Sequence, residues 1–300
     1  MIKLVTHNQG FHADDVMAYA ILQEVLTKRG ETWTIERTRD QAIIDAADIA
    51  FDIGYEYDAA RNRYDHHQPG KAGARPNGVQ YAACGLIWKH FGRELCSEAV
   101  WELLDKSMFQ EMDASDNGQT FIKEFVFPDS WATTLTIHIA RFEAHSYQEK
   151  TPEQFLVEFE SAAAFARGIL QRAIANEEFF EQAFQQASEE YRNAPDKQII
   201  QFSRNFQRPT WKRIAEYPEP IFAVYFNYKN NDWKVEAVPV TPFVLESRKT
   251  APAAWYGLRD QELQHVTGVS DATFCHPSGF LFGAKSFEGA MQLAKIALSM

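Results

Sequence analysis

The sequence predicts an α/β protein, because short apolar runs typical of strands alternate with segments whose apolar residues recur at helical spacing. Its beginning has the order strand, helix, strand, helix, strand, which is typical of a parallel sheet covered by helices. A long Ala-, Glu- and Gln-rich stretch and a series of short apolar runs follow. We therefore expect a parallel-sheet domain over residues 1–150, a helical connector over 151–195 and a smaller α+β domain over 196–300.

The elements of the first part follow from apolar spacing and from the positions of Gly and Pro. A helix is predicted from Val16 to Val25 because its apolar residues recur at helical spacing, and Gly30 ends it. The Gly- and Pro-rich stretch 69–78 predicts a loop. The remaining predicted elements are strands over residues 2–6, 33–38 and 49–53 and helices over 41–47, 79–91 and 97–112.

The connector and the last part differ in their pattern of apolar residues. Apolar side chains form one broad face along residues 152–192, so we expect an amphipathic helix packed on a core. Beyond Pro195 the pattern becomes β-rich, with an Asn-Asn-Asp sequence as a hairpin turn. The predicted elements are strands over 198–202, 221–227 and 233–238, a helix over 259–266, a segment over 274–283 and a final helix after Ser286.

The composition describes a protein with a sizeable core and an excess of negative charge. Its 300 residues are 45% apolar and carry a formal charge of −11, which argues against indiscriminate binding of long nucleic-acid duplexes. A local basic strip is still a route for a polyanion, and ordinary solvated surface is the alternative interpretation of each candidate strip. The candidates are Arg61, Arg63, Lys71 and Arg75, and Arg204, Arg208, Lys212 and Arg213.

Cysteine usage and the length of apolar runs bear on location. Cys84, Cys96 and Cys275 are odd in number and lack a C-x-x-C pairing, which favours a reducing compartment. No uninterrupted apolar run approaches the roughly 20 residues of a membrane span, so we expect no membrane association. We therefore expect a cytoplasmic protein, and the sequence leaves assembly into a homo-oligomer open.

Potential metal ligands gather in the first 116 residues. His7, Asp52 and the trio Asp65, His66 and His67 each follow a short apolar run. Because the carboxyl ends of parallel strands meet at one edge of a sheet, we expect these side chains to share a crevice. Alone, His7 would favour backbone capping, but two adjacent imidazoles behind a carboxylate offer little to packing and are costly to desolvate. Together they predict a hydrolytic site for divalent cations.

These residues stand in ordered blocks that resemble a known family. In the first half the blocks are Thr6-His7-Asn8, Phe11-His12-Ala13-Asp14-Asp15, Asp52-Ile53-Gly54, Tyr64-Asp65-His66-His67-Gln68 and Asp113-Ala114-Ser115-Asp116-Asn117-Gly118. Later blocks include Glu246-Ser247-Arg248, Trp255-Tyr256-Gly257-Leu258-Arg259 and His276-Pro277-Ser278-Gly279-Phe280. The chain resembles the DHH phosphoesterase superfamily and, within it, is similar to the metal-dependent hydrolase family of the melanocyte proliferating gene product. The resemblance implies a DHH-type catalytic domain followed by a substrate-holding domain.

The resemblance also implies roles for individual residues. Two divalent cations would share Asp52 as a bridge. His7 and His12 would complete one ion site, and Asp14, His66 and Asp116 the other. The usual opening motif has an aspartate where this chain has His12, and the added imidazole favours Mn²⁺ or Zn²⁺ over Mg²⁺, with Mn²⁺ the first expectation.

The resemblance makes Asp52, Asp65 and His67 catalytic. Asp65 would orient His66, and His67 would contact the scissile phosphate or protonate the leaving oxygen. A helix cap or a salt bridge is an equal alternative for Arg259, one of the substrate contacts expected in the second half. Those contacts are Arg248, Lys249, Arg259, His276 and Lys285.

The implied activity is 3′-to-5′ exonucleolysis of single-stranded RNA or of a short oligonucleotide. Base stacking is one interpretation of four aromatic residues, and burial in the core is the other: Trp131, Trp211, Tyr256 and Phe280. Two other functions remain open. The acidic charge favours hydrolysis of a small phosphate compound such as a dinucleotide, a cyclic dinucleotide or pyrophosphate. The other open function is that of a non-catalytic binding protein in which a metal ion stabilises the fold.

Overall fold

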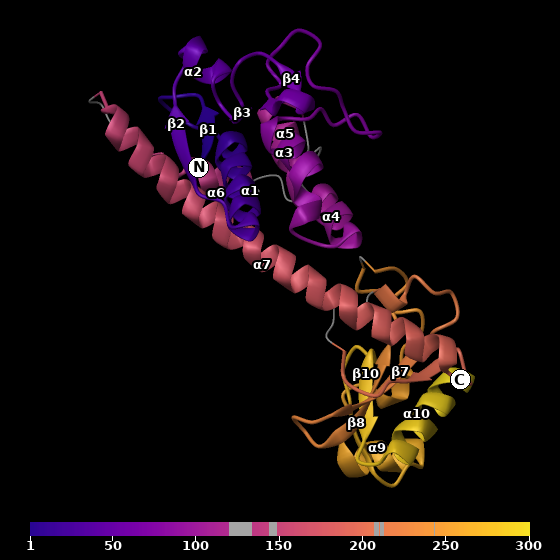
Figure 1. The fold of residues 1–300 in the computed structure, drawn as a ribbon. Coiled ribbons are helices and arrows are strands. Elements are labelled where there is room, and N and C mark those ends of the chain that lie inside the picture. Colours follow the sequence, from indigo (N-terminus) through magenta and orange to yellow (C-terminus); the bar gives the residue numbers. More distant parts are fainter. Residues whose placement is uncertain (120–133, 144–148, 207–209, 211–212, 243) are drawn as a thin grey trace. The chain divides into compact units, whose positions relative to one another are not determined.

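The computed structural model describes residues 1–119, 134–143, 149–206, 210, 213–242 and 244–300. They form two compact units, Met1–Glu178 and Phe179–Met300 (Figure 1). Each unit contains a five-stranded sheet with helices, so the predicted α/β class is confirmed. The finer division at residues 150 and 195 stays a prediction. Four residues named above lie outside the described residues: Trp131, Arg208, Trp211 and Lys212.

The sheet of the first unit has the strand order β2-β1-β3-β5-β4. Its middle strand pairs are parallel, and only the edge strand β4 runs antiparallel to its neighbour β5. The carboxyl ends of β1, β3 and β5 therefore meet at one edge. The strands are β1 (Ile2–Thr6), β2 (Trp33–Arg37), β3 (Ile49–Phe51), β4 (Tyr57–Asp58) and β5 (Arg63–Tyr64).

Two buried helices pack together beside this sheet. α1 (Ala13–Arg29) ends at Gly30, whose φ of 69° is the left-handed conformation that glycine adopts without strain. It packs against α3 (Ala83–Phe91), and their apolar faces form the core of the unit. α4 (Glu98–Leu104) continues through a π-helical turn at Asp105–Phe109 into α5, which extends the predicted helix to Asp116. The remaining short helices are α2 (Gln41–Asp45), α5 (Gln110–Asp116) and α6 (Leu135–Ala140).

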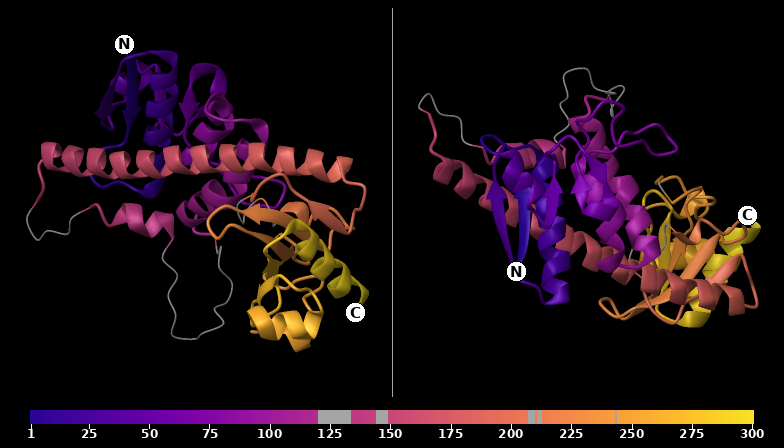
Figure 2. Two further views of the ribbon diagram at one scale, coloured as in Figure 1. Left: turned by 90° about the horizontal axis from the view of Figure 1, so that it is seen from below. Right: turned by 45° about the horizontal axis from the view of Figure 1, so that its top comes forward.

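The long helix α7 (Pro152–Asn193) is continuous in both views of Figure 2. Its predicted apolar face is buried or half-buried: Phe159 and Ala166 lie in the core of the first unit, and Phe184 lies in a core of the second. α7 therefore supplies side chains to both units. Among the described helices, none combines the length and the apolar composition that crossing a membrane requires.

The sheet of the second unit has the strand order β6-β7-β8-β10-β9, with only β6 and β7 parallel. The predicted segment 274–283 forms parts of two antiparallel strands with a tight turn at Gly279 between them. Phe222, Trp255 and Phe282 are buried at the centre of the core. The elements are β6 (Ile199–Gln201), β7 (Phe222–Asn227), β8 (Asp232–Ala237), α9 (Asp260–Thr267), β9 (Ala272–Cys275), β10 (Leu281–Ala284) and α10 (Phe287–Ser299).

Candidate metal centre

Three neighbouring strand ends carry the first group of predicted site residues. His7 directly follows β1, Asp52 follows β3 and Asp65 follows β5. The backbone twists sharply after β3, because Asp52 and Tyr55 have φ values of 54° and 56°. Such left-handed backbone in residues other than glycine costs roughly 1–3 kcal/mol each and is concentrated at functional sites. The strained turn places the Asp52 carboxylate, which is 3% exposed, inside the group.

His66 lies among three carboxylates. Its Nε2 atom is 3.3 Å from Asp52 Oδ1, 3.1 Å from Asp116 Oδ2 and 3.8 Å from Asp14 Oδ2. Asp14 comes from the first turn of α1, and Asp116 from the last turn of α5. The structure thus brings together Asp14, His66 and Asp116 with one oxygen of Asp52, four donors from four separate segments.

A second group forms around the other oxygen of Asp52. His7 Nε2 lies 3.3 Å from Asp52 Oδ2, and the donor atoms of His7, His12 and Asp52 all lie within 4.8 Å of one another. The His7 Nδ1 atom lies 3.2 Å from the carbonyl oxygen of Asn8. This contact favours the N–H on Nδ1, which leaves Nε2 free to bind a cation. His12 Nδ1 is also 3.8 Å from Asp116 Oδ1, so His12 lies between the two groups.

A separate observation indicates that the two groups can hold divalent cations. Asp52 Oδ1 and His66 Nε2 are buried, and neither has a hydrogen-bond partner within the protein. Buried polar atoms without partners are rare in folded proteins, and a bound ion is one arrangement that satisfies them. Two donors that bind one ion at about 2.1 Å lie at most about 4.2 Å apart, and the distances around His66 satisfy this limit. Imidazole with carboxylate suits Mn²⁺, Zn²⁺ or Mg²⁺.

The electrostatics of the centre show the same need for positive charge. Burial and the nearby Asp116 and Asp52 carboxylates raise the pKa of Asp14 well above its ordinary value. Burial alone would lower the pKa of His66, but the Asp116 and Asp52 carboxylates outweigh it and raise that pKa to about 11. The pKa of His7 is likewise raised despite its burial. In the protein alone, the surrounding carboxylates therefore favour the positively charged form of the His66 and His7 imidazoles.

Asp65 holds His67 rather than the ring of His66. Its Oδ1 atom accepts a hydrogen bond from His67 Nδ1 at 2.7 Å, and the same oxygen accepts from the backbone N–H groups of His66 and His67. The ring of His66 instead points its Nδ1 toward Asn117 Oδ1, 3.4 Å away. The expectation that Asp65 orients the His66 ring is therefore wrong in this geometry. The side chain of His67 is 45% exposed, so its ring is oriented at one nitrogen and accessible to solvent.

Two further residues complete the centre and lack a predicted role. Buried Asp15 accepts a hydrogen bond from the His12 backbone N–H at 2.8 Å, and its other oxygen lies 3.4 Å from His7 Nε2. Asn117 contacts His66 as described above. The available sequence signal for Asp15 was the H-x-x-D spacing at a helix start, which is typical of a capping interaction. For Asn117 it was only its position directly after Asp116.

The first predicted basic strip does not form a surface. Arg63 and Arg75 are 6% and 5% exposed. Arg63 donates to backbone carbonyls, among them those of Asp45 and Ala47, and Arg75 pairs with Asp105 and Asp113. Both interpretations of the strip, polyanion binding and solvated surface, are therefore wrong for these two arginines. Arg61 and Lys71 are exposed.

The substrate contacts predicted in the second unit fall into two kinds. Arg248 donates to the carbonyl oxygens of Ala215, Pro218 and Pro220, and Lys249 donates to that of Leu298. Both side chains therefore bind the backbone of their own unit. The other three predicted contacts are exposed or half-buried, with the His276 ring against Phe280 at 4.5 Å between centroids. They are Arg259, His276 and Lys285.

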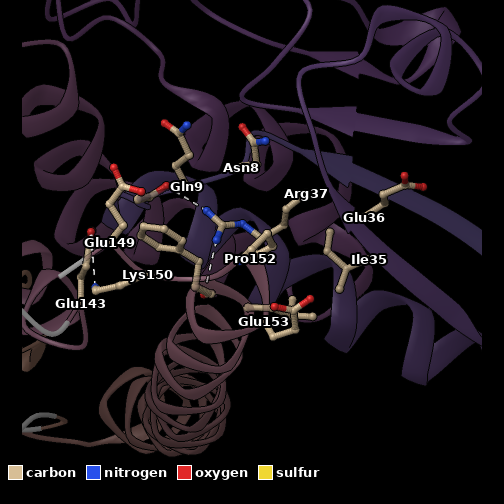
Figure 3. Close-up of a pocket in the computed structure, with 13 residues that line it drawn as sticks. Asn8, Gln9, Ile35, Glu36, Arg37, Glu143, Glu149, Lys150, Pro152 and Glu153 are labelled. Atoms are coloured by element: carbon tan, nitrogen blue, oxygen red, sulfur yellow. Dashed lines mark hydrogen bonds and ion pairs between the residues drawn. The ribbon is translucent and has the colours of Figure 1, made fainter. Parts of the chain in front are cut away.

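A cavity of about 960 Å³ lies beside the loop that follows His7 (Figure 3). Two positively charged side chains of the cavity already bind acceptors of the protein. Arg37 donates to the carbonyl oxygen of Gly10 at 2.9 Å, and Lys150 pairs with Glu158 at 2.7 Å. Arg37 Nη2 also lies 3.8 Å from Asp15 Oδ2. The cavity is lined by Asn8, Gln9, Gly10, Arg37, Glu143 and Lys150, among others. It contains none of the predicted cation ligands.

Comparison with known proteins identifies the family. A model for MYG1 exonuclease, described as an uncharacterised protein family (UPF0160), matches residues 3–298. The human protein named MYG1 exonuclease is 29% identical, over 99% of this chain and 86% of its own length. A MYG1 protein of Schizosaccharomyces pombe is also 29% identical, over 99% of this chain and 98% of its own.

A solved structure of RecJ from Thermus thermophilus in complex with Mn²⁺ is similar at a TM-score of 0.28 and 14% identity. That match covers 100% of this chain and 52% of the RecJ chain. The family match spans nearly the whole chain, and it confirms the resemblance that the motif blocks indicated. The chain belongs to the MYG1 exonuclease family (UPF0160).

Proposed function

We propose that this protein is a metal-dependent phosphodiesterase that degrades single-stranded RNA from its 3′ end and uses two divalent cations, with Mn²⁺ preferred. The single observation that carries the proposal is the position of Asp52. One of its oxygens lies 3.3 Å from His66 Nε2, and the other lies 3.3 Å from His7 Nε2. A carboxylate between two donor groups is the arrangement that a bridging ligand of two cations needs.

The chain's own residues suggest a division of labour. Asp52, His7 and His12 would hold one cation, and Asp52, Asp14, His66 and Asp116 the other. When bound, the two cations would lower the pKa of a water molecule and neutralise charge on the phosphate. His67, held at Nδ1 by Asp65, would present Nε2 to the leaving oxygen and give it a proton. No covalent nucleophile from the protein is required.

The accessibility of the centre favours catalysis over a purely structural metal site. Structural sites are closed, whereas catalytic sites keep a position open to water and substrate. The side chains of His12 and His67 are 68% and 45% exposed, so solvent reaches two sides of the group. The name of the human relative supports a nucleic acid as substrate. Arg259, His276 and Lys285 of the second unit are the candidates for holding the rest of the strand.

Hydrolysis of a small phosphate compound is the second candidate function. Two observations favour it: the formal charge of −11, and the burial of Arg63 and Arg75, which removes two cations from the accessible surface. A long strand would depend on several phosphate contacts, and a dinucleotide or pyrophosphate would not. The free cysteines Cys84, Cys96 and Cys275 support a reducing compartment, and we propose the cytoplasm.

The test is a hydrolysis screen with Mn²⁺ and purified protein. The substrates are single-stranded RNA, single-stranded DNA, cyclic and linear dinucleotides and pyrophosphate. We expect RNA labelled at its 5′ end to shorten progressively, with nucleoside monophosphates as products. RNA lengths from two to ten nucleotides at two salt concentrations then separate the candidates, because each contacted phosphate steepens the salt dependence. A profile that peaks at two nucleotides and ignores salt would replace the exonuclease with a small-phosphodiester hydrolase.

A further inference from the structure

One buried cluster of charged side chains has no part in the chemistry proposed above. It consists of Arg75, Asp105 and Asp113, and we call it the Arg75 cluster. Arg75 is 5% exposed and Asp113 is fully buried. Burying charge is costly even when the charges are paired, so such clusters are weak evidence of stability and often specify an arrangement instead. The Arg75 cluster joins the loop that carries Arg75 to the helical segment that carries Asp105 and Asp113, 30 and 38 residues further along the chain.

The guanidinium of Arg75 uses all three of its nitrogens. Nε donates to Asp105 Oδ2 at 2.9 Å, and Nη2 donates to Asp105 Oδ1 at 2.7 Å. Nη1 donates to Asp113 Oδ2 at 2.5 Å. Arg75 also lies over the ring of Tyr81, 4.2 Å from its centroid. The loop that carries Arg75 follows His67 and has left-handed glycines at Gly70, Gly73 and Gly78. Arg75 is therefore a buried anchor in a segment with little regular structure.

The other oxygen of Asp113 contacts the start of α3. Asp113 Oδ1 accepts from the Gly85 N–H at 3.1 Å and from the Cys84 thiol at 3.3 Å. A Cβ atom on Gly85 would lie 1.9 Å from Asp113 Oδ2, so only glycine fits there. The two preceding N–H groups of α3, those of Ala83 and Cys84, donate to Asp14 at 2.9 and 2.7 Å. Asp14 and Asp113 thus share the N-terminal N–H groups of one helix.

This sharing explains why Asp14, Cys84 and Asp113 lie close enough to resemble a third cation site. Each oxygen of both carboxylates already accepts a hydrogen bond from the protein. The N-terminal N–H groups of α3 and the Arg75 guanidinium supply the positive charge. A cation is not required to satisfy these groups. Their contacts instead connect Arg75 to Asp14, which is a proposed ligand of the second ion.

The same cluster connects to two other members of the His66 group. Asp113 lies one turn before Asp116 on α5. The Asn117 side-chain amide donates to the Asp113 carbonyl oxygen at 2.9 Å, and its oxygen lies 3.4 Å from His66 Nδ1. A shift of Asp113 would therefore move Asp116 and the partner of the His66 ring as well as the helix that contacts Asp14.

We propose that Arg75 is a positioning residue for the second ion site, an inference that rests on the proposed function. Through Asp113 it links α3 to α5. The N–H groups of α3 hold Asp14 of α1, α5 carries Asp116, and both carboxylates contact His66 Nε2. Without the guanidinium, Asp113 is a buried carboxylate without its cationic partner, which is strongly unfavourable. A displacement of α3 or α5 would expose or re-pair the Asp113 carboxylate, and it would move Asp14 or Asp116 away from its position beside His66.

The test measures Mn²⁺ binding directly, by isothermal titration calorimetry on the full chain, with thermal unfolding of the cation-free protein alongside. The variants are Arg75→Gln, Arg75→Lys and the double variant Arg75→Gln/Asp113→Asn. The matched control is Arg93→Gln, because Arg93 makes a similar bidentate pair with Glu98 on the exposed surface. We expect Arg75→Gln to weaken one of two Mn²⁺ sites by about 10–100-fold, the range typical of residues that orient ligands.

Arg75→Lys should weaken the site less, because it keeps the charge. The double variant should recover part of the affinity, because no unpaired charge remains. Arg93→Gln should bind both ions as the wild type does. A lower melting temperature in Arg75→Gln together with wild-type affinity at both sites would make the role merely structural and overturn the inference. If Arg75→Gln does not fold, unchanged affinities in Arg75→Lys overturn it equally.

The failure of this inference is distinguishable from the failure of the proposed function. Two Mn²⁺ ions that bind with the same affinities in the wild type and in every Arg75 variant would refute only the role of Arg75. A wild-type protein that binds no Mn²⁺ would refute both. A protein whose Mn²⁺ binding depends on Arg75 but which hydrolyses no phosphodiester would retain the positioning role and lose the proposed activity.

Discussion

Replacing Asp65 with asparagine tests the interaction that sets His67 in place. The Asp65 carboxylate is 1% exposed and accepts four hydrogen bonds. Its Oδ2 atom accepts from the Tyr55 N–H at 2.6 Å, and its Oδ1 accepts from two backbone N–H groups and from His67 Nδ1. Burial opposes ionisation, but the His67 ring and the backbone donors outweigh it and lower the pKa of Asp65. The protein is thus arranged for the charged form.

The expected cost follows from these contacts. In Asp65→Asn the amide oxygen can take the place of Oδ1 and keep its three hydrogen bonds. The NH₂ group then takes the place of Oδ2 and faces another donor, the Tyr55 N–H. A buried donor without an acceptor costs about 1–3 kcal/mol. The three bonds at the other oxygen become neutral and lose about half their strength, roughly 0.5–1 kcal/mol each. We expect the free energy of unfolding to fall by about 2.5–6 kcal/mol and kcat to fall by about 10²–10⁴-fold, because His67 loses the charged partner of its hydrogen bond.

Urea denaturation and single-stranded RNA hydrolysis with Mn²⁺ measure the two effects. The control is Asp40→Asn, because Asp40 is exposed and caps α2 through one bond to the Ala42 N–H, a role that asparagine performs equally well. The control should keep wild-type stability and turnover. A loss of less than about 1 kcal/mol in Asp65→Asn, together with wild-type kcat, would refute the assignment of Asp65 to His67.

Further predictions follow from individual contacts. Asp52→Ala should bind neither Mn²⁺ ion with wild-type affinity in calorimetry, since its two oxygens face both donor groups; unchanged stoichiometry would remove it from the bridge. His67→Ala should retain both ions while kcat falls by roughly 10²–10⁴-fold, and loss of an ion would make it a ligand. Chelation should abolish hydrolysis, with Mn²⁺ restoring more activity than Mg²⁺ at equal concentration because imidazole donors favour the later metal. Burial raises the pKa of Glu160, so its ionisation disfavours the folded state as pH rises through that pKa. Glu160→Gln should therefore stabilise the protein more at pH 7 than at pH 4, and denaturation curves that differ equally from the wild type at both values would contradict this.

Local patterns in the sequence were sufficient for the α/β class and for most elements. The helix predicted over 152–192 is Pro152–Asn193, because a repeating apolar face determines a helix wherever a core receives it. The donor types of the metal centre were equally readable, since His7, Asp52 and Asp65 each follow a strand and parallel strands end at one edge. These features depend on spacing along the chain and on residue type alone.

Tertiary structure decided which groups pair and which are buried. Arg75 became a buried partner of Asp113, 38 residues away, although its setting in a Gly- and Pro-rich stretch predicted a surface loop. Asp14 accepts N–H groups from α3, 69 and 70 residues away, and Asp65 holds the ring of His67 instead of that of His66. A hydrogen bond or ion pair between distant segments depends on how helices and strands pack. Residue spacing cannot specify such a contact until the fold has placed both partners.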